Sequence, residues 1–276
     1  MKKIDLHLHS YYSDGSSSLE EILSQIEREK VSVFSITDHN FISPEIENFQ
    51  KTIQEAEMGF LQGVEISCMD KTSRQSIHML GYSKSFNIEK INNDLKTVLV
   101  GYNERAKKIV EKLNQEFGFD LNFEKIKSSI KSPFVSRNLL AEILIEKVDK
   151  SLTMKDALKK VFINEDDSWM IDAEEAIDII KRSGGKAILA HPGNLINKLN
   201  FDNLVINLKD RGLDGVETYY RKHDLETVEF LKNKCKELNL VITGGSDWHG
   251  HKYSDFSPGI LIEENTYNQF INLFKA

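Results

Sequence analysis

Short apolar strands alternate with amphipathic helices along most of this chain, and this alternation restricts the possible folds most. Residues 3–9 have a strict period of two, so apolar and polar side chains face opposite sides of a strand. A helix follows, because Ser18 and Glu21 form a Ser-x-x-Glu capping box ahead of apolar residues at helical spacing. Further strands are predicted at residues 31–37, 59–67, 77–83, 186–190, 215–218 and 240–245. Seven strands alternating with helices favour an α/β barrel.

Other local signals refine this order. Ser43 and Pro44 predict the start of a second helix, Asp172 and Asp224 predict two further helix starts, and Gly184 predicts a helix end. The strands at 59–67 and 77–83 are too close in sequence for a parallel crossover, so they are predicted to form a hairpin. That hairpin places Glu65 and His78 at the same end of the sheet.

Strand patterns disappear between residues 88 and 167. Helical patterns take their place at 88–117, 136–147 and 153–162. We therefore predict a barrel from residues 1–87 and 169–276, with a helical insertion at 88–168 that forms a cap beside the site. Substrate selection is expected in this insertion, because the barrel rim carries the candidate metal ligands.

Composition excludes several classes of protein. No apolar stretch approaches a bilayer-spanning length, no secretory signal is visible, and two cysteines in 276 residues form no disulfide framework, so a soluble cytoplasmic protein is expected. The net charge of −7 argues against binding long nucleic acid, although a small anionic substrate remains possible if metal supplies positive charge. The oligomeric state is left open.

Ionisable residues gather where the predicted strands end. In α/β barrels the carboxyl ends of the strands form the active site, so residues distant in sequence converge there. A lone histidine at a strand end is more often structural, but six histidines and three carboxylates at one rim would repel and resist desolvation without cations. The nine candidate ligands are His7, His9, Asp14, His39, Glu65, His78, His191, Asp247 and His249. This set suits two or three divalent ions, and ligands without thiolates suit Mn²⁺, Fe²⁺ or Zn²⁺.

Competing chemistries have weaker signals. Ser246 lies near Asp247 and His249, but the Gly-x-Ser-x-Gly nucleophile elbow of serine hydrolases is absent. Cys68 and Cys235 lack the neighbours that activate a thiol, so both are interpreted as packing residues.

The strand-end motifs resemble those of the PHP (polymerase and histidinol phosphatase) superfamily. The segments HLHSYYSDG, ITDHN, GVEIS with IHMLGY, AILAHPG and GGSDWHG occur in the family's order across nearly the whole chain. The likeness is to the stand-alone branch that includes 3',5'-nucleoside bisphosphate phosphatases, also described as short-RNA 5'-exonucleases. It implies a distorted seven-stranded (β/α) barrel with a trinuclear metal site and an insertion between the fourth and fifth strands.

The resemblance also implies roles for individual residues. The nine candidate ligands match the family's metal positions, with Glu65 as the bridging carboxylate, and Asp38 is expected to orient His39. Arg137 and His223 match positions that the family places near the substrate phosphate. At the position of Arg137, relatives commonly have the sequence Arg-Pro-His or a similar one, whereas this chain has Arg137-Asn138-Leu139.

These roles predict a metal-dependent phosphomonoesterase. Asp247 is the candidate to hold the attacking water and accept its proton, and His223 is the candidate to protonate the leaving oxygen. The expected substrate is a small phosphorylated metabolite, most simply a nucleoside 3',5'-bisphosphate or short oligonucleotide, and no membrane partner is expected. The alternatives are a histidinol-phosphate-type or sugar-phosphate phosphatase and, from another class, a non-catalytic metal-binding module.

Overall fold

The computed structural model describes residues 1–55, 58–148, 150–164, 168–196 and 201–275. Within these residues the strands are β1 (Lys2–Leu8), β2 (Val33–Ile36), β3 (Gly59–Met69), β4 (Ser76–Ser83), β5 (Ile171–Asp172), β6 (Lys186–Leu189), β7 (Gly215–Tyr220), β8 (Val241–Gly245) and β9 (Ile260–Ile262). The helices of the same residues are α1 (Leu19–Arg28), α2 (Ile46–Glu55), α3 (Ile88–Asp94), α4 (Lys96–Phe117), α5 (Phe123–Ser128), α6 (Arg137–Lys147), α7 (Met154–Lys160), α8 (Ala173–Arg182), α9 (Phe201–Asp210), α10 (Leu225–Leu238) and α11 (Glu264–Asn272), with a short 3₁₀ turn at Pro192–Asn194.

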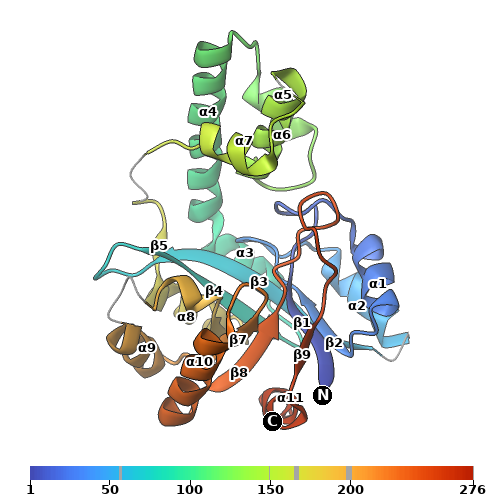
Figure 1. The fold of residues 1–276 in the computed structure, drawn as a ribbon, viewed down its shortest axis with the longest axis vertical. Helices are drawn as coiled ribbons and strands as arrows, with labels where there is room; N and C mark the ends of the chain where they lie inside the picture. The colour runs from blue at the N-terminus through green and yellow to red at the C-terminus, as the bar shows by residue number, and fades with distance from the viewer. Residues whose placement is uncertain (56–57, 149, 165–167, 197–200, 276) are drawn as a thin grey trace.

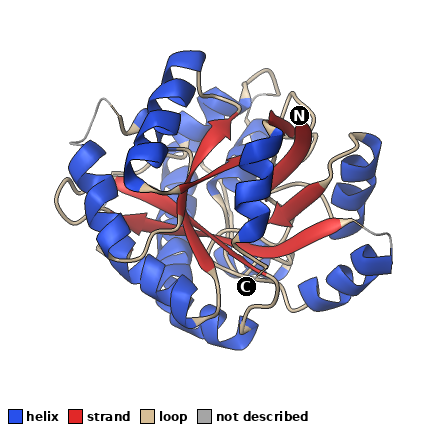
Figure 2. Ribbon diagram, turned by 90° about the horizontal axis from the view of Figure 1, so that it is seen from below, coloured by secondary structure: helices blue, strands red, loops and turns tan. Residues whose placement is uncertain are grey.

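The strands form one sheet in the order β8-β7-β6-β4-β3-β2-β1-β9, with β5 beside β3. β4 runs antiparallel to both β3 and β6, which confirms the predicted hairpin, while the β1–β2, β2–β3, β6–β7 and β7–β8 pairs are parallel. At the rim β1 meets the segment after β8, because the amide of His9 donates to the carbonyl of Trp248 at 2.9 Å. The sheet therefore curls into the predicted α/β barrel, with helices outside it (Figure 2).

All seven predicted strands are present, and two short ones were missed. β5 has two residues and β9 has three, which is too short for a period of two to show in sequence. Residues with 0% exposure, including Leu8, Phe34 and Ile66, pack between the sheet and the surrounding helices. This packing fixes the strand ends from which the candidate ligands project.

Most predicted helix ends are confirmed. Ser18 and Glu21 exchange the hydrogen bonds of a capping box, and the Asp224 side chain caps α10. Gly184 follows α8 with φ of +88°, a conformation that glycine adopts without strain. Pro44 was wrongly placed in a helix: it lies in a turn, and α2 begins at Ile46.

Two further helix predictions need correction. The helical run at 88–117 is interrupted at Leu95, which ends α3 and begins α4. Asp172 does precede α8, but its side chain makes no capping hydrogen bond and instead lies 3.1 Å from the Lys71 ammonium.

The helices between β4 and β5 divide between two hydrophobic cores. Ile91, Leu95 and Val98 pack into the main core of the barrel, whereas α4 beyond Ala106 packs with α5, α6 and α7 around a separate core. Figure 1 shows this second group standing apart from the sheet on the side of the strand ends. Residues 149 and 165–167 of the predicted insertion lie outside the described residues. Among the described residues, no helix is both long and apolar enough to cross a membrane.

Candidate metal centre

The fold brings all nine predicted ligands to one rim of the barrel. Each lies in or just after a strand, except Asp14, which lies in the loop between β1 and α1. The hydrogen-bonded strands set the spacing of these side chains, and the loops after β1, β2, β6 and β8 complete the set: His7, His9, Asp14, His39, Glu65, His78, His191, Asp247 and His249.

Glu65 of β3 lies at the centre of the cluster. Its Oε2 atom is 3.1 Å from the Nε2 atoms of both His7 and His9. Its Oε1 atom is 2.7 Å from Nδ1 of His78 and 3.0 Å from Nε2 of His191. The Glu65 side chain is 1% exposed, so its carboxylate faces histidine rings rather than solvent. One carboxylate therefore faces four candidate ligands from three other segments of the chain.

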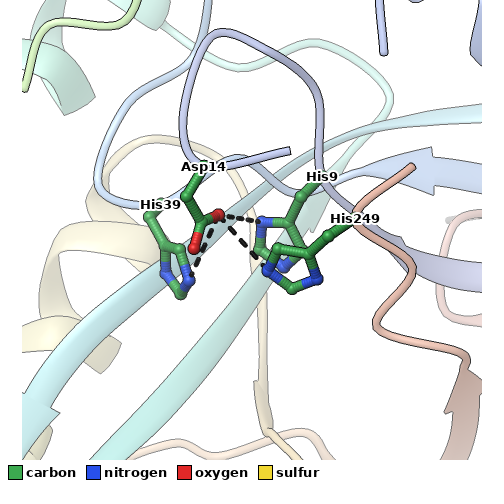
Figure 3. Close-up of side chains that lie close together, drawn as sticks. All are labelled: His9, Asp14, His39 and His249. Carbon is green, nitrogen blue, oxygen red and sulfur yellow. Dashed lines mark ion pairs between the residues drawn. The ribbon is translucent and has the colours of Figure 1, made fainter. Parts of the chain in front are cut away.

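A second group surrounds Asp14. Its Oδ1 atom lies 3.3 Å from Nε2 of His249, 3.7 Å from Nδ1 of His9 and 3.9 Å from Nε2 of His39 (Figure 3). The other ring nitrogen of His39 lies 3.3 Å from Oε2 of Glu65. His9 and His39 thus connect the Asp14 group to the Glu65 group.

Asp247 closes the cluster on the opposite side from Asp14. Its Oδ1 atom lies 3.3 Å from Nε2 of His9 and 3.6 Å from Nε2 of His7. Its Oδ2 atom accepts a hydrogen bond of 3.0 Å from the Tyr220 hydroxyl. One carboxylate oxygen is therefore oriented by the protein while the other faces the imidazoles.

The donor atoms fit divalent metal ions. Two nitrogen or oxygen ligands of one ion, each about 2.1 Å from it, lie about 3.0–3.4 Å apart, which matches the distances around Glu65. Three overlapping ligand groups have donor atoms within 4.8 Å of one another: His7, His9, Glu65 and Asp247; His9, Asp14, His39 and His249; and His39, Glu65 and His78. Within the described chain, six of these buried atoms make no hydrogen bond: His7 Nε2, His9 Nδ1 and Nε2, Asp14 Oδ1, His39 Nδ1 and Glu65 Oε2. Metal ions would satisfy atoms that burial otherwise penalises.

Electrostatics of the cluster favour ionised carboxylates. Burial would raise the pKa of Asp14, but the His249 and His39 imidazoles outweigh it and hold that pKa well below its usual range. Burial also opposes a charge on His9, yet the Asp247 and Glu65 carboxylates overcome it and raise the His9 pKa to about 10. For His39 burial dominates and lowers the pKa to about 4. Without metal ions, protonated histidines supply the positive charge that balances these carboxylates, and bound metal ions would supply it instead.

Two ligand positions have unusual backbone conformations. Asp247 has φ of +59° and His191 has φ of +26°, in a region that residues with a side chain rarely adopt. The Asp247 amide donates to the carbonyl of His7 at 2.9 Å, and the His191 amide donates to Oε2 of Glu217 at 2.8 Å. These hydrogen bonds hold the strained backbone that aims both side chains at the cluster.

Two supporting carboxylates were missed by the sequence analysis. Glu217 of β7 has no exposed surface, lies 3.0 Å from Nδ1 of His7 and accepts from the His191 amide. Asp5 of β1 is also buried, accepts from the Ser246 amide at 2.9 Å, and has its pKa raised by burial to about 6. The sequence offered one signal for Glu217, because a carboxylate inside a predicted apolar strand at 215–218 needs a polar partner.

Asp38 does not orient His39 as predicted. Its carboxylate accepts hydrogen bonds from the Ser10 amide at 2.8 Å, the Ser10 hydroxyl at 2.6 Å and the Ser13 hydroxyl at 2.5 Å. His39 instead faces Glu65, as described above. Asp38 therefore holds the loop that carries Asp14 rather than a ligand imidazole.

A cleft of about 360 Å³ leads from the ligands to the helical insertion. Arg137 at the start of α6 and Arg105 of α4 both line it, together with Asp14, His39 and His78. Burial, and then the nearby Arg105 charge, lower the pKa of Arg137. Sequence analysis found Arg137 through the family resemblance but missed Arg105, which lies in no motif. We refer to this space as the arginine cleft.

His223 lies beside the cluster rather than in it. Its ring centre is 5.1 Å from that of Tyr220. Its Nδ1 atom lies 2.9 Å from the Thr218 carbonyl, and its Nε2 atom accepts from the Gly193 amide at 3.0 Å. Burial lowers its pKa, which agrees with a neutral ring in these two hydrogen bonds. Its role as a general acid stays a prediction.

Comparison with known proteins identifies the family. Residues 5–188 match the PHP domain family, and the chain therefore belongs to it. A 3',5'-nucleoside bisphosphate phosphatase of Chromobacterium violaceum is 24% identical over 90% of this chain and 88% of its own length. A phosphoribosyl 1,2-cyclic phosphate 1,2-diphosphodiesterase of Eggerthella lenta is 26% identical over 89% of this chain and 94% of its own.

Two further matches extend along nearly the whole chain, one in sequence and one in fold. A 5'-3' exoribonuclease of Haemophilus influenzae is 28% identical over 90% of both chains. In fold, the chain resembles a protein of Bifidobacterium adolescentis, provisionally assigned as a metal-dependent phosphoesterase, with a TM-score of 0.83 and 23% identity over 99% of this chain and 96% of the other. The similarity thus spans the barrel and the inserted helices.

Proposed function

We propose that this protein, a metal-dependent phosphoesterase of the PHP family, removes a terminal phosphate from a nucleoside 3',5'-bisphosphate or short oligonucleotide. The observation that carries the substrate proposal is the arginine cleft, in which Arg105 and Arg137 face the same space as three candidate metal ligands. A guanidinium offers paired donors that match phosphate oxygens. A substrate with two phosphates would place one at the metal centre and the other at the arginines.

The proposed reaction is hydrolysis of a phosphate ester. A water oxygen attacks phosphorus, the ester P–O bond breaks, and the leaving alkoxide takes up a proton. Divalent ions, when bound by the nine ligands, would polarise the phosphoryl oxygens and lower the pKa of the water. Asp247, a candidate ligand through Oδ1, is proposed to accept a proton from that water through Oδ2, the oxygen that the Tyr220 hydroxyl orients.

The helices of the insertion are proposed to select the substrate. The division into a barrel of residues 1–87 and 169–276 and a cap of residues 88–168 puts Arg105 and Arg137 in the cap. Phe134 and Ser136 line the same cleft from the segment before α6. Differences in these residues would change the substrate without disturbing the ligands on the strands.

A substrate panel tests the proposal. The Mn²⁺-loaded protein is assayed with adenosine 3',5'-bisphosphate, a 5'-phosphorylated trinucleotide, phosphoribosyl 1,2-cyclic phosphate, histidinol phosphate and p-nitrophenyl phosphate. We expect the highest kcat/KM with one of the first two. A higher value for histidinol phosphate or the cyclic phosphate would contradict the proposed substrate while leaving a phosphoesterase. No hydrolysis of any compound, with metal bound, would favour a non-catalytic metal-binding module.

A further inference from the structure

A second cleft, of about 380 Å³, borders the metal centre at Asp14. Asp14, Phe134 and Ser136 line both clefts, so the segment before α6 separates them. The remaining lining comes from the loop after β1, the segment between α5 and α6, the first turn of α6 and the loop after β8: Tyr11, Ser13, Gly15, Ser129, Ile130, Lys131, Ser132, Leu139 and Tyr253. We refer to this space as the tyrosine cleft.

Its walls carry fewer charged side chains than those of the arginine cleft, which is also lined by aromatic and aliphatic side chains. Tyr11, Tyr253, Ile130 and Leu139 supply aromatic and aliphatic surface, and the cationic side chain here is Lys131. The Lys131 ammonium lies 3.2 Å from the Tyr11 hydroxyl and 5.0 Å from the centre of its ring. An ammonium has three donors, so Lys131 retains hydrogen-bonding capacity toward a ligand.

Three of the four serine hydroxyls that line the tyrosine cleft already donate hydrogen bonds within the protein. Ser132 donates to the Phe134 carbonyl at 2.7 Å, Ser129 donates to the Ile126 carbonyl at 2.7 Å, and Ser13 donates to Asp38 at 2.5 Å. Few hydrogen-bond donors therefore remain in this cleft to recognise a particular arrangement of polar atoms on a ligand. Such a surface suits a flat ring with some polar atoms at its edge, bound mainly through its faces.

We propose that the tyrosine cleft binds the nucleobase of the substrate. This inference rests on the proposed function, because it places the cleaved phosphate at the ligands and the second phosphate in the arginine cleft. The base is then the remaining part of the molecule, and of the two clefts the tyrosine cleft has the walls with fewer charged side chains. Since three of the four serine hydroxyls are engaged, the cleft distinguishes a nucleotide from a sugar phosphate but discriminates weakly between bases.

Binding to metal-free protein isolates the contribution of the base. Adenosine 3',5'-bisphosphate and its abasic counterpart, 1-O-methylribose 3,5-bisphosphate, are titrated calorimetrically into chelator-treated protein. We expect the nucleotide to bind about tenfold more tightly or better, as stacking of one base on aromatic side chains allows. The ratio of the two Kd values cancels the shared phosphate contacts.

Variants of two lining residues, Tyr253 and Leu139, test whether this ratio arises in the cleft. Tyr253→Ala removes a ring, Tyr253→Phe keeps it, and Leu139→Trp fills the space from α6. We expect the ratio to approach one in Tyr253→Ala and Leu139→Trp and to persist in Tyr253→Phe, with circular dichroism verifying the fold. Replacing adenine with cytosine should change Kd by only a few-fold.

Two results would overturn the inference. These are a wild-type ratio near one, or an undiminished ratio in both Tyr253→Ala and Leu139→Trp. Failure of the proposed function looks different, because Mn²⁺-loaded protein would then hydrolyse neither bisphosphate whatever the binding ratio. The two hypotheses can therefore fail independently.

Discussion

The Oε1 atom of Glu217 lies 3.0 Å from Nδ1 of His7, and neither side chain is exposed. Once His7 is neutral, a carboxylate at Nδ1 favours the tautomer that carries the remaining proton there, which leaves Nε2 as an electron-pair donor. That Nε2 atom is 3.1 Å from Glu65 and makes no hydrogen bond within the described residues. Glu217 thus orients His7 as a metal ligand without being a candidate ligand itself.

Replacing Glu217 should weaken metal binding. Glu217→Gln keeps the shape but removes the charge that stabilises the His7 proton, so we expect metal affinity to fall by roughly tenfold to a hundredfold. Competition with a chromogenic chelator measures that affinity. Glu229→Gln, at an exposed position of α10, is the matched control and should behave as wild type. Equal affinities for wild type and Glu217→Gln would leave Glu217 a structural residue.

Protein purified without chelators should carry more than one equivalent of transition metal. Nine ligands in overlapping groups suit more than one ion, and burial penalises their unsatisfied donor atoms without metal. Elemental analysis of the protein as purified measures the content, and chelation should abolish phosphatase activity until metal is restored. Full activity in a preparation free of metal would refute the metal-dependent mechanism.

Metal binding should release protons. The pKa of His9 is raised to about 10 and that of His7 is raised as well, because nearby carboxylates stabilise their charged forms against burial. Both rings are therefore protonated near pH 7 in the metal-free protein, and each must lose its proton to bind an ion. The apparent affinity for metal ions should therefore rise as the pH is raised from about 7 toward the His9 pKa of about 10. Calorimetric titrations with Zn²⁺ in two buffers of different ionisation enthalpy count the protons, and a heat independent of the buffer would contradict this account.

Loss of Arg137 should harm bisphosphate substrates selectively. A charge-assisted hydrogen bond contributes about 1.5–3 kcal/mol, so Arg137→Ala should lower kcat/KM for adenosine 3',5'-bisphosphate by roughly tenfold to a hundredfold. Arg137→Lys keeps the charge without the planar fork and should recover part of the loss. Hydrolysis of p-nitrophenyl phosphate should decrease much less. Equal decreases for both substrates would place Arg137 in the scaffold or at the metals, and no decrease would make it a surface residue.

The parts predicted from sequence are those with local signals. The alternation at residues 3–9 located His7 and His9, and the short spacing from Glu65 to His78 identified the hairpin that brings them together. The role of Asp38 was predicted wrongly because the prediction used only its position next to His39. Its actual partners, Ser10 and Ser13, come from the loop after β1. Arg105 was missed because a helical arginine shows nothing of the cleft it faces until α4 is placed over the rim.

Closure of the barrel also determines when the site can form. The hydrogen bonds from His9 to Trp248 and from Asp247 to His7 join segments from nearly opposite ends of the sequence. During synthesis on the ribosome, the first histidines emerge long before their last partners, so a growing chain has only part of the ligand set. Contacts this distant in sequence form slowly, since a long loop must close first. We therefore expect the two ligand groups that contain Asp247 or His249 to be completed only when the barrel closes.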